Sequence, residues 1–425
     1  MALALAAVTS ALAQTGTWNG KLQVQGMELS LVFRIDENTA ALDVPDQGAK
    51  DIPVEVERST FGGIKLAIPA INASYEGIWT GRLITGTFTQ HGIQFPLTLS
   101  PGAPILNRPQ TPVGPFPYVN EDVTFSNGDA VLKGTLTMPK DCSRETPVLI
   151  MVTGSGLQNR DEEMFGHKPF LVIADAFARA GIATLRYDDR GFGESTGDVI
   201  FCTTEDLKND ALAGIELLRE RFSHIGVLGH SEGGSIALML AAADNADFIV
   251  SLAGMVVSGA ETLLEQNRMA LTGAGVAAAD VESYCRLLTA TYDAVIGGLP
   301  LPSPNDYDIP DDLKQNWAMA SRQLQTPYMR YFLAMDLTGI LGDVTCPVMA
   351  LNGTKDSQVS CRRNLEALAA GLPMAASRNV VKAEDGLNHL FQHCRTGAPA
   401  EYKEISETFS PEVLTEMIRW IKSLF

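Results

Sequence analysis

The sequence predicts an α/β protein in which a mostly parallel sheet, covered by helices on both faces, follows a small antiparallel β domain. Three observations support this prediction. From residue 147 onward, short apolar runs alternate with helical segments, a pattern typical of parallel sheets buried on both faces. Before residue 101, apolar and polar residues alternate with period two between Gly and Asn turns. A proline-rich segment separates the two patterns.

Length and composition restrict the possible partners. A chain of 425 residues with 45% hydrophobic residues is long enough for two domains with sizeable cores. The formal net charge of −18 disfavours nucleic acids and anionic membranes, because it repels both. After the N-terminus, no apolar run approaches the ~20 residues that span a bilayer. We therefore expect no nucleic-acid partner and no integral membrane segment, and the composition leaves a homo-oligomer open.

The cysteines do not indicate a metal site. The six are scattered, without a CxxC pair or metal-ligand spacing. Some could pair in an exported protein, but the sequence does not choose among the pairings, and free buried thiols are an equal alternative. No phosphate-binding Gly-rich loop is present either, so we expect neither a metal nor a cofactor.

The N-terminus resembles an export signal. Residues 1–13 form an apolar run that ends in Ala11-Leu12-Ala13, as at a signal cleavage site, although a basic start is missing. The alternative is a plain N-terminal tail. We expect residues 1–13 to be a signal remnant and the protein to be periplasmic or secreted.

Residues 14–100 are predicted to form the β domain. Strands are expected at 22–24, 29–35, 64–68, 83–89 and 95–99, in a bent or barrel-like antiparallel sheet with a structural or docking role. Residues 101–118 contain six prolines, which prevent helix and ladder formation and favour a stiff linker.

Residues 119–425 are predicted to form the second domain. A hairpin around Asn127-Gly128 comes first, and buried strands are expected at 147–152, 182–187, 225–228, 248–252, 347–351 and 379–382. Helices are expected between them, at 170–179, 206–222, 235–241, 362–370 and 411–424. A helical insertion at about 259–342 interrupts the alternation, with helices expected at 261–269, 281–294 and 313–324.

The most informative motif is Gly229-His230-Ser231-Glu232-Gly233, which lies between an apolar strand and a helix. A serine on such a sharp turn presents its hydroxyl to a cleft, and the crowded turn tolerates only small residues two positions away. The bare pattern also occurs by chance, so its meaning depends on whether an acid and a histidine follow.

An acid and a histidine do follow, at later strand ends. A serine hydroxyl is a weak nucleophile and needs a base within hydrogen-bond reach. His389 follows the last strand, and Asp356 follows the preceding one, where it could hold the imidazole in the required tautomer. His393 is the rival base, and Asp343 and Asp385 are the rival acids, but all three are less well placed relative to the strand ends.

The oxyanion of such a reaction needs N–H donors. One is expected from the backbone of Glu232, the residue after the nucleophile, and the other from the Gly-rich turn after the first parallel strand. We select Ser155 for the second donor, with Gly156 as the alternative. The adjacent charged run at residues 160–163 is expected to form a solvated face, and Asp189 and Arg190 to be structural.

These residues resemble the α/β-hydrolase superfamily, and within it the esterase and serine-aminopeptidase-like hydrolases. The resemblance covers residues 121–425, whereas the N-terminal β domain lies outside it. The matching segments are 229–233, Asp189-Arg190-Gly191-Phe192-Gly193-Glu194-Ser195, Gly353-Thr354-Lys355-Asp356 and Asn388-His389. The resemblance implies Ser231 as nucleophile, His389 as base, Asp356 as its orienting acid, and the helical insertion as a cap. One departure is Thr153-Gly154 in place of the usual His-Gly, which leaves the register of the second oxyanion donor open.

The expected function is hydrolysis of carboxylic esters with small to medium acyl chains through an acyl-enzyme. An aminopeptidase or amidase with the same triad is the alternative, and a catalytically idle binding protein is a third hypothesis. Five cap residues are candidates for an apolar substrate lining. They are Trp317, Tyr328, Met329, Tyr331 and Phe332.

Overall fold

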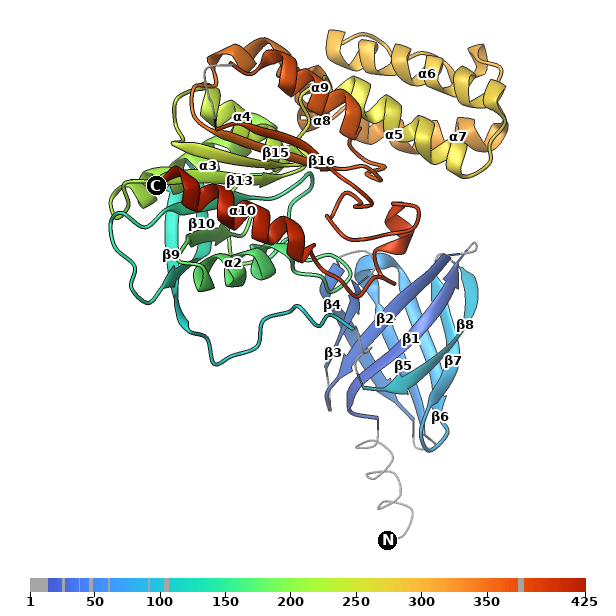
Figure 1. Ribbon diagram of the computed structural model, residues 1–425. Coiled ribbons are helices and arrows are strands. Elements are labelled where there is room, and N and C mark those ends of the chain that lie inside the picture. Colours follow the sequence, from blue (N-terminus) through green and yellow to red (C-terminus); the bar gives the residue numbers. More distant parts are fainter. Residues whose placement is uncertain are drawn as a thin grey trace. The chain divides into compact units, whose positions relative to one another are not determined.

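The computed structural model describes residues 14–24, 27–37, 39–45, 49–59, 62–90, 92–102, 107–373 and 378–425 (Figure 1). The chain divides into two compact units, Met1–Arg108 with Met164–Gly166 and Pro109–Glu163 with His167–Phe425. The predicted export signal at residues 1–13 lies outside the described residues. No helix within the described ranges combines the length and apolar character needed to cross a bilayer.

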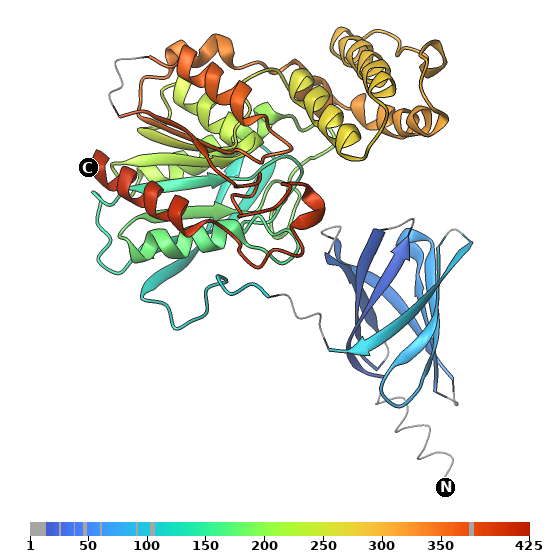
Figure 2. The same cartoon turned by 45° about the vertical axis from the view of Figure 1, so that its right-hand side comes forward.

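The first unit is a closed barrel of eight antiparallel strands, which confirms the prediction of a barrel-like antiparallel sheet (Figure 2). Each strand pairs with the next along the chain, and β8 closes the ring on β1 through Trp18–Pro101 and Asn19–Ser100. The strands are β1 (Gly16–Val24), β2 (Met27–Ile35), β3 (Ala40–Val44), β4 (Ala49–Arg58), β5 (Gly63–Ile68), β6 (Ala73–Trp79), β7 (Ile84–Gln90) and β8 (Ile93–Pro101).

Three of these strands, β3, β4 and β6, are absent from the sequence prediction. In β4 the alternating apolar residues are interrupted by Pro53 and by charged residues, which weaken the strand pattern. In β6, Gly77 weakens it further. A Cβ atom at Gly77 would lie 2.7 Å from Ile84 Cγ2, so the close approach of β7 requires glycine there.

Side chains fill the inside of the barrel. The aromatic rings of Phe33, Tyr75 and Phe88 are almost fully buried, together with a set of aliphatic side chains from all eight strands. The Tyr75 hydroxyl donates to the carbonyls of Ile84 (2.9 Å) and Leu97 (3.2 Å), and burial raises its pKa well above the usual value. An eight-stranded barrel is just wide enough for side chains to fill, and this interior is a packed core.

The second unit contains an eight-stranded sheet in the order β16-β15-β14-β13-β11-β12-β10-β9. β9 and β10 form the predicted hairpin, β10 runs antiparallel to β12, and the remaining neighbours are parallel. The strands are β9 (Tyr118–Asn127), β10 (Ala130–Pro139), β11 (Val148–Val152), β12 (Ala183–Tyr187), β13 (Ile225–His230), β14 (Phe248–Leu252), β15 (Val348–Gly353) and β16 (Val380–Glu384).

Helices cover both faces of this sheet, which explains why its central strands are apolar throughout (Figure 1). Val148, Ile150 and Val152 pack with α3 (Thr204–Arg219), α4 (Glu232–Ala242) and α9 (Cys361–Gly371). Leu149 and Met151 point the other way, toward α2 (Pro169–Arg179) and α10 (Pro411–Leu424). The predicted α/β-hydrolase architecture is confirmed.

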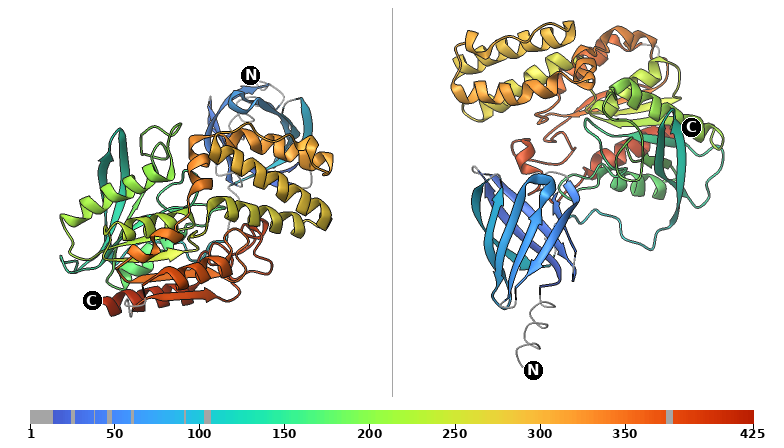
Figure 3. Two further views of the ribbon diagram at one scale, coloured as in Figure 1. Left: turned by 90° about the horizontal axis from the view of Figure 1, so that it is seen from above. Right: turned by 180° about the vertical axis from the view of Figure 1, so that it is seen from behind.

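The insertion between β14 and β15 forms a helical cap with its own core (Figure 3). Its helices are α5 (Gly259–Gly273), α6 (Ala278–Gly297), α7 (Asp311–Leu324) and α8 (Pro327–Ala334), followed by the 3₁₀ helix η4 (Thr338–Asp343). The sequence predicts the first three helices but not α8, which begins three residues after α7 ends.

The barrel core provides a stability prediction. Phe33→Ala removes a fully buried ring, so we expect the free energy of unfolding of the barrel to fall by about 3–5 kcal/mol. Ile93→Ala is the control, because Ile93 is 61% exposed and its truncation should change stability by less than ~0.5 kcal/mol. Urea denaturation followed by circular dichroism measures both, and equal effects of the two substitutions would contradict a packed barrel.

Candidate active site

Ser231 forms the turn between β13 and α4 in a strained conformation. Its φ of 54° and ψ of −119° are unfavourable for a residue with a side chain, at a cost of about 1–3 kcal/mol. The glycines two positions before and after Ser231 fix this conformation sterically. A Cβ atom on Gly229 would lie 1.9 Å from the Gly233 carbonyl oxygen, and one on Gly233 would lie 2.0 Å from the Val152 carbonyl oxygen. The two glycines are therefore required sterically, and the strand and the helix enclose the serine between them.

His389 and Asp356 are brought together on neighbouring loops at the carboxyl end of the sheet. His389 Nδ1 lies 2.7 Å from Asp356 Oδ2, and both side chains are buried. The other carboxylate oxygen accepts the backbone N–H groups of Gln358 (2.7 Å) and Val359 (2.9 Å). A carboxylate only accepts, so the Nδ1 proton belongs to His389, and its Nε2 is left to act as a base.

The rival residues are engaged elsewhere. His393 is largely exposed and its Nδ1 lies 3.0 Å from Glu407 Oε1. Asp385 Oδ1 accepts the hydroxyl of Thr354 at 3.2 Å. Asp343 belongs to η4 and lines a groove beside α4. Of the residues predicted for acid and base, the structure thus brings only Asp356 and His389 together.

The turn after β11 passes directly against the nucleophile. A Cβ atom on Gly154 would lie 3.1 Å from Ser231 Cβ. Ser155, the next residue, is exposed, and Gly156 has a φ of 89°. Within the described part of the chain, no protein group accepts a hydrogen bond from the backbone N–H of Ser155 or of Glu232. Both predicted donors therefore remain available to an oxyanion.

Asp189 forms hydrogen bonds with both ends of this turn. Its carboxylate accepts the Thr153 hydroxyl (2.8 Å to Oδ2) and the Gln158 backbone N–H (2.8 Å). Burial raises the pKa of Asp189 to about 8, although the hydrogen bonds from Gln158 and Thr153 oppose the shift. Thr153, which replaces the His of the usual His-Gly, is thus a structural anchor, and Asp189 is structural as expected.

The charged run at residues 160–163 is not a solvated face, contrary to the sequence interpretation. The Glu162 side chain is 2% exposed, and the Arg160 side chain is 16% exposed. Arg160 pairs with Asp188 at 2.8 Å. The run turns inward because its charges meet buried partners from other segments, which sequence distance hides.

Glu162 and His230 form a second buried carboxylate–histidine pair that sequence reasoning missed. His230 Nδ1 lies 2.8 Å from Glu162 Oε1, and the same oxygen accepts the Gly154 backbone N–H at 2.9 Å. His230 Nε2 lies 2.9 Å from the carbonyl oxygen of His389. A glutamate eight residues after Gly154 and a histidine before the serine were the available signals.

The Glu232 carboxylate is also buried, and both of its oxygens accept hydrogen bonds. One oxygen accepts the Thr204 hydroxyl of α3 at 2.7 Å, and the other accepts the Tyr328 hydroxyl of α8. Burial raises the pKa of the Tyr328 hydroxyl well above the usual value. The cap therefore contacts Glu232, whose N–H group is predicted to hold the oxyanion.

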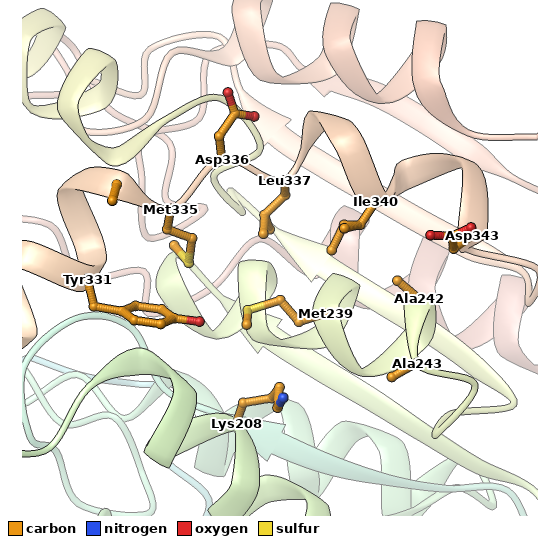
Figure 4. Close-up of a pocket in the computed structure, with 11 residues that line it drawn as sticks. Lys208, Met239, Ala242, Ala243, Tyr331, Met335, Asp336, Leu337, Ile340 and Asp343 are labelled. Atoms are coloured by element: carbon orange, nitrogen blue, oxygen red, sulfur yellow. The ribbon is translucent and has the colours of Figure 1, made fainter. Parts of the chain in front are cut away.

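The other cap candidates have different positions. Trp317 belongs to the core of the cap, where its indole N–H donates to the Thr291 hydroxyl at 2.8 Å. Phe332 is buried and Met329 half-buried. Tyr331 lines a groove of about 500 Å³ beside α4, together with Met239, Met335 and Ile340 (Figure 4).

Comparisons with known proteins place these residues in a family. A family model described as serine aminopeptidase, S33, matches residues 168–389, which is more than half of the chain. The matched region contains Ser231, Asp356 and His389, whereas the turn that carries Ser155 precedes it.

The individual proteins similar to this chain share only a minor part of its sequence. Esterase EstD of Thermotoga maritima is 27% identical over 312 residues, which cover 73% of this chain and 69% of the relative. The solved structure of the esterase Pf2001 of Pyrococcus furiosus is 16% identical, covers 76% of this chain and 99% of its own, and has a TM-score of 0.46. A proline iminopeptidase of Mycobacterium smegmatis is 15% identical, with 71% and 98% covered and a TM-score of 0.44.

The raised pKa of Asp189 predicts a pH-dependent stability. The folded state binds the Asp189 proton more tightly than the unfolded chain does, so this proton stabilises the fold. The stabilisation is complete at pH values below the unfolded pKa of 3.8 and is lost as pH rises toward about 8. The Asp189→Asn side chain does not titrate. The difference in free energy of unfolding between variant and wild type should therefore shift in favour of the variant as pH rises from 5 to 8. We expect a gain of at least ~1.4 kcal/mol, the equivalent of one pKa unit.

Denaturant unfolding of both proteins at the two pH values measures this difference. If the variant and the wild type lost stability in parallel from pH 5 to pH 8, Asp189 would be ionised at both.

Proposed function

Because the chain belongs to the serine aminopeptidase S33 family of α/β-hydrolases, we propose that it is a serine carboxylesterase acting on esters of small to medium acyl chains. The carrying observation is the 2.7 Å contact between His389 and Asp356, on loops beside the strained serine. The named esterase of Thermotoga maritima, which is 27% identical, supports the choice of ester as substrate.

The geometry supports the following reaction. The Ser231 hydroxyl attacks the ester carbonyl and gives its proton to His389 Nε2, while Asp356 stabilises the imidazolium that forms. The oxyanion accepts the N–H of Glu232 and that of Ser155, with Gly156 as the alternative. His389 then protonates the departing alcohol, and a water activated by the same imidazole hydrolyses the acyl-enzyme.

Aminopeptidase activity is the second candidate, since the family name and the triad both allow it. An aminopeptidase needs a carboxylate that is free to bind the substrate amine. The carboxylate beside the nucleophile, that of Glu232, is buried and accepts two hydroxyl donors. In α5 of the cap, Glu261 and Glu265 both pair with Arg363. These commitments favour ester over peptide as substrate.

We also propose that the protein is exported, on the basis of the apolar run and the Ala-x-Ala pattern in residues 1–13. The N-terminal sequence of the protein recovered from the periplasm or the medium tests this. An N-terminus near Gln14 is expected, and full-length protein confined to the cytoplasm would contradict it.

The triad prediction is direct. Ser231→Ala should lower kcat/KM for p-nitrophenyl acetate or butyrate by a factor on the order of 10⁴ or more. Asp356→Asn should cause a loss of similar order, because the neutral amide favours the wrong tautomer of His389. A panel of acyl chain lengths defines the acyl preference, and aminoacyl p-nitroanilides in the same assay test the aminopeptidase alternative.

Three outcomes would contradict the proposal. A wild-type protein that cleaves no activated ester would favour an idle binding protein. Faster cleavage of the anilides than of the esters would favour the aminopeptidase. Full activity in Ser231→Ala would remove the serine from the mechanism.

The contact between the cap and Glu232 gives a further prediction. Tyr328→Phe leaves the buried Glu232 carboxylate without one donor, a loss of about 1.5–3 kcal/mol for a hydrogen bond to a charged group. If that bond holds the oxyanion donors in place, kcat for the ester should fall by roughly tenfold or more.

Tyr331→Phe is the matched control. It removes a similar bond, from the Tyr331 hydroxyl of the same helix to Glu205 Oε2 at 3.0 Å, away from the serine. We expect near-normal kcat in this variant, and equal kcat losses in both would mean that the cap contact serves stability alone.

A further inference from the structure

His230 directly precedes the nucleophile in the chain, and its pair with Glu162 takes no part in the proposed reaction. We propose that His230 is held as an imidazolium by Glu162 and is a positioning residue that fixes the catalytic histidine loop relative to the oxyanion turn. The inference rests on the proposed function for its kinetic consequence, but the charge of His230 can be measured without any assay of activity.

The hydrogen-bond partners determine how many protons the pair holds. His230 Nε2 faces the carbonyl oxygen of His389 at 2.9 Å, and a carbonyl only accepts, so Nε2 carries a proton. His230 Nδ1 faces Glu162 Oε1 at 2.8 Å, and that oxygen already accepts the Gly154 N–H at 2.9 Å. One proton must also lie between Nδ1 and Oε1. We assign it to Nδ1, because a charged carboxylate accepts more strongly than a neutral acid from both the ring and the Gly154 N–H, so that both ring nitrogens donate and the ring is charged.

The surroundings favour this charge only in the presence of Glu162. The rest of the small space around the pair is lined by apolar side chains of α2, β14 and the loops after β16. The charged and titratable groups that face His230 are Glu162, Asp356 and the His389 ring, whose centroid lies 4.7 Å away. Burial lowers the pKa of His230, but the two carboxylates and the contact with the His389 carbonyl outweigh it and raise the pKa above the usual value.

The pair connects three segments that the reaction needs in register. Glu162 accepts from Gly154 and so holds the turn that carries Ser155. His230 is the last residue of the strand that leads to Ser231, and its Nε2 contacts the carbonyl of His389. Glu162 itself adopts a φ of 52°, a conformation that costs energy and that its buried contacts maintain. Loss of either side chain should displace the base and the oxyanion donors together.

The proton count gives the pair a pH dependence. Because the folded state raises the pKa of His230, the stabilisation is complete at pH values below the ordinary histidine pKa and is lost as pH rises through the raised value. Above it, one of the two ring protons leaves and one of the two contacts is lost. Ester turnover by the wild type should therefore decline on the alkaline side.

Substitution of each member of the pair, with an exposed pair as control, tests the positioning role. We expect His230→Gln and Glu162→Gln to lower kcat for p-nitrophenyl butyrate roughly 10- to 100-fold, with KM changed less than about threefold, because the loss affects the transition state. The alkaline decline of kcat should disappear in His230→Gln. His393→Gln breaks the exposed contact with Glu407 on the same segment and should leave kcat and its pH profile unchanged.

Nitrogen-15 NMR of the histidine-labelled full chain tests the charge without any assay of activity. At pH 6, below the ordinary histidine pKa, the wild type should show a histidine signal with both ring nitrogens protonated that is absent from His230→Gln. A singly protonated His230 in the wild type would overturn the inference, as would normal kcat and an unchanged pH profile in a folded His230→Gln. Because the NMR result does not depend on ester cleavage, an inactive wild type would refute the proposed function and leave the charge inference to stand or fall separately.

Discussion

The backbone at Ser231 is the constraint on which the rest of the second unit depends. A side-chain-bearing residue at a φ of 54° persists only if its surroundings exclude the relaxed alternatives. Here β13 and α4 are packed so closely that only glycine fits at Gly229 and Gly233. Two large apolar cores, one on each face of the sheet, hold the strand and the helix at that distance. The energy of the cores thus maintains the strained, half-buried Ser231 at the carboxyl end of the central strand β13.

Three buried carboxyl groups surround this turn, and each joins segments that are distant in sequence. Glu162 accepts from the oxyanion turn and from His230, Asp189 accepts from both ends of the same turn, and Glu232 accepts from α3 and from the cap. A buried carboxylate without donors is costly, so each one stabilises the arrangement that supplies its donors. The site is therefore preorganised by acids that do not themselves react, and the cap is part of that arrangement.

The fold was accessible from the sequence because strand and helix periodicities follow burial directly, and the buried strands of the second unit lie where apolar runs predict them. Short or irregular elements were missed: α8 begins at a proline just after α7, and β4 contains Pro53. The roles of Glu162 and Tyr328 were beyond prediction for a different reason. A run of charged residues is usually solvated and a tyrosine on a helix is usually packed, and only tertiary contacts supply the donors and acceptors that reverse those expectations. The catalytic roles of Ser231, Asp356 and His389 remain predictions.

The proposed mechanism requires Ser231 to become covalently bonded during turnover. A fluorophosphonate reacts with an activated serine and leaves an adduct that is stable enough for peptide mass spectrometry. We expect close to one adduct per chain, located on the peptide that contains Ser231, and none when His389 is replaced by Ala. An adduct on a different residue, or no adduct in a folded wild-type protein that cleaves esters, would contradict it.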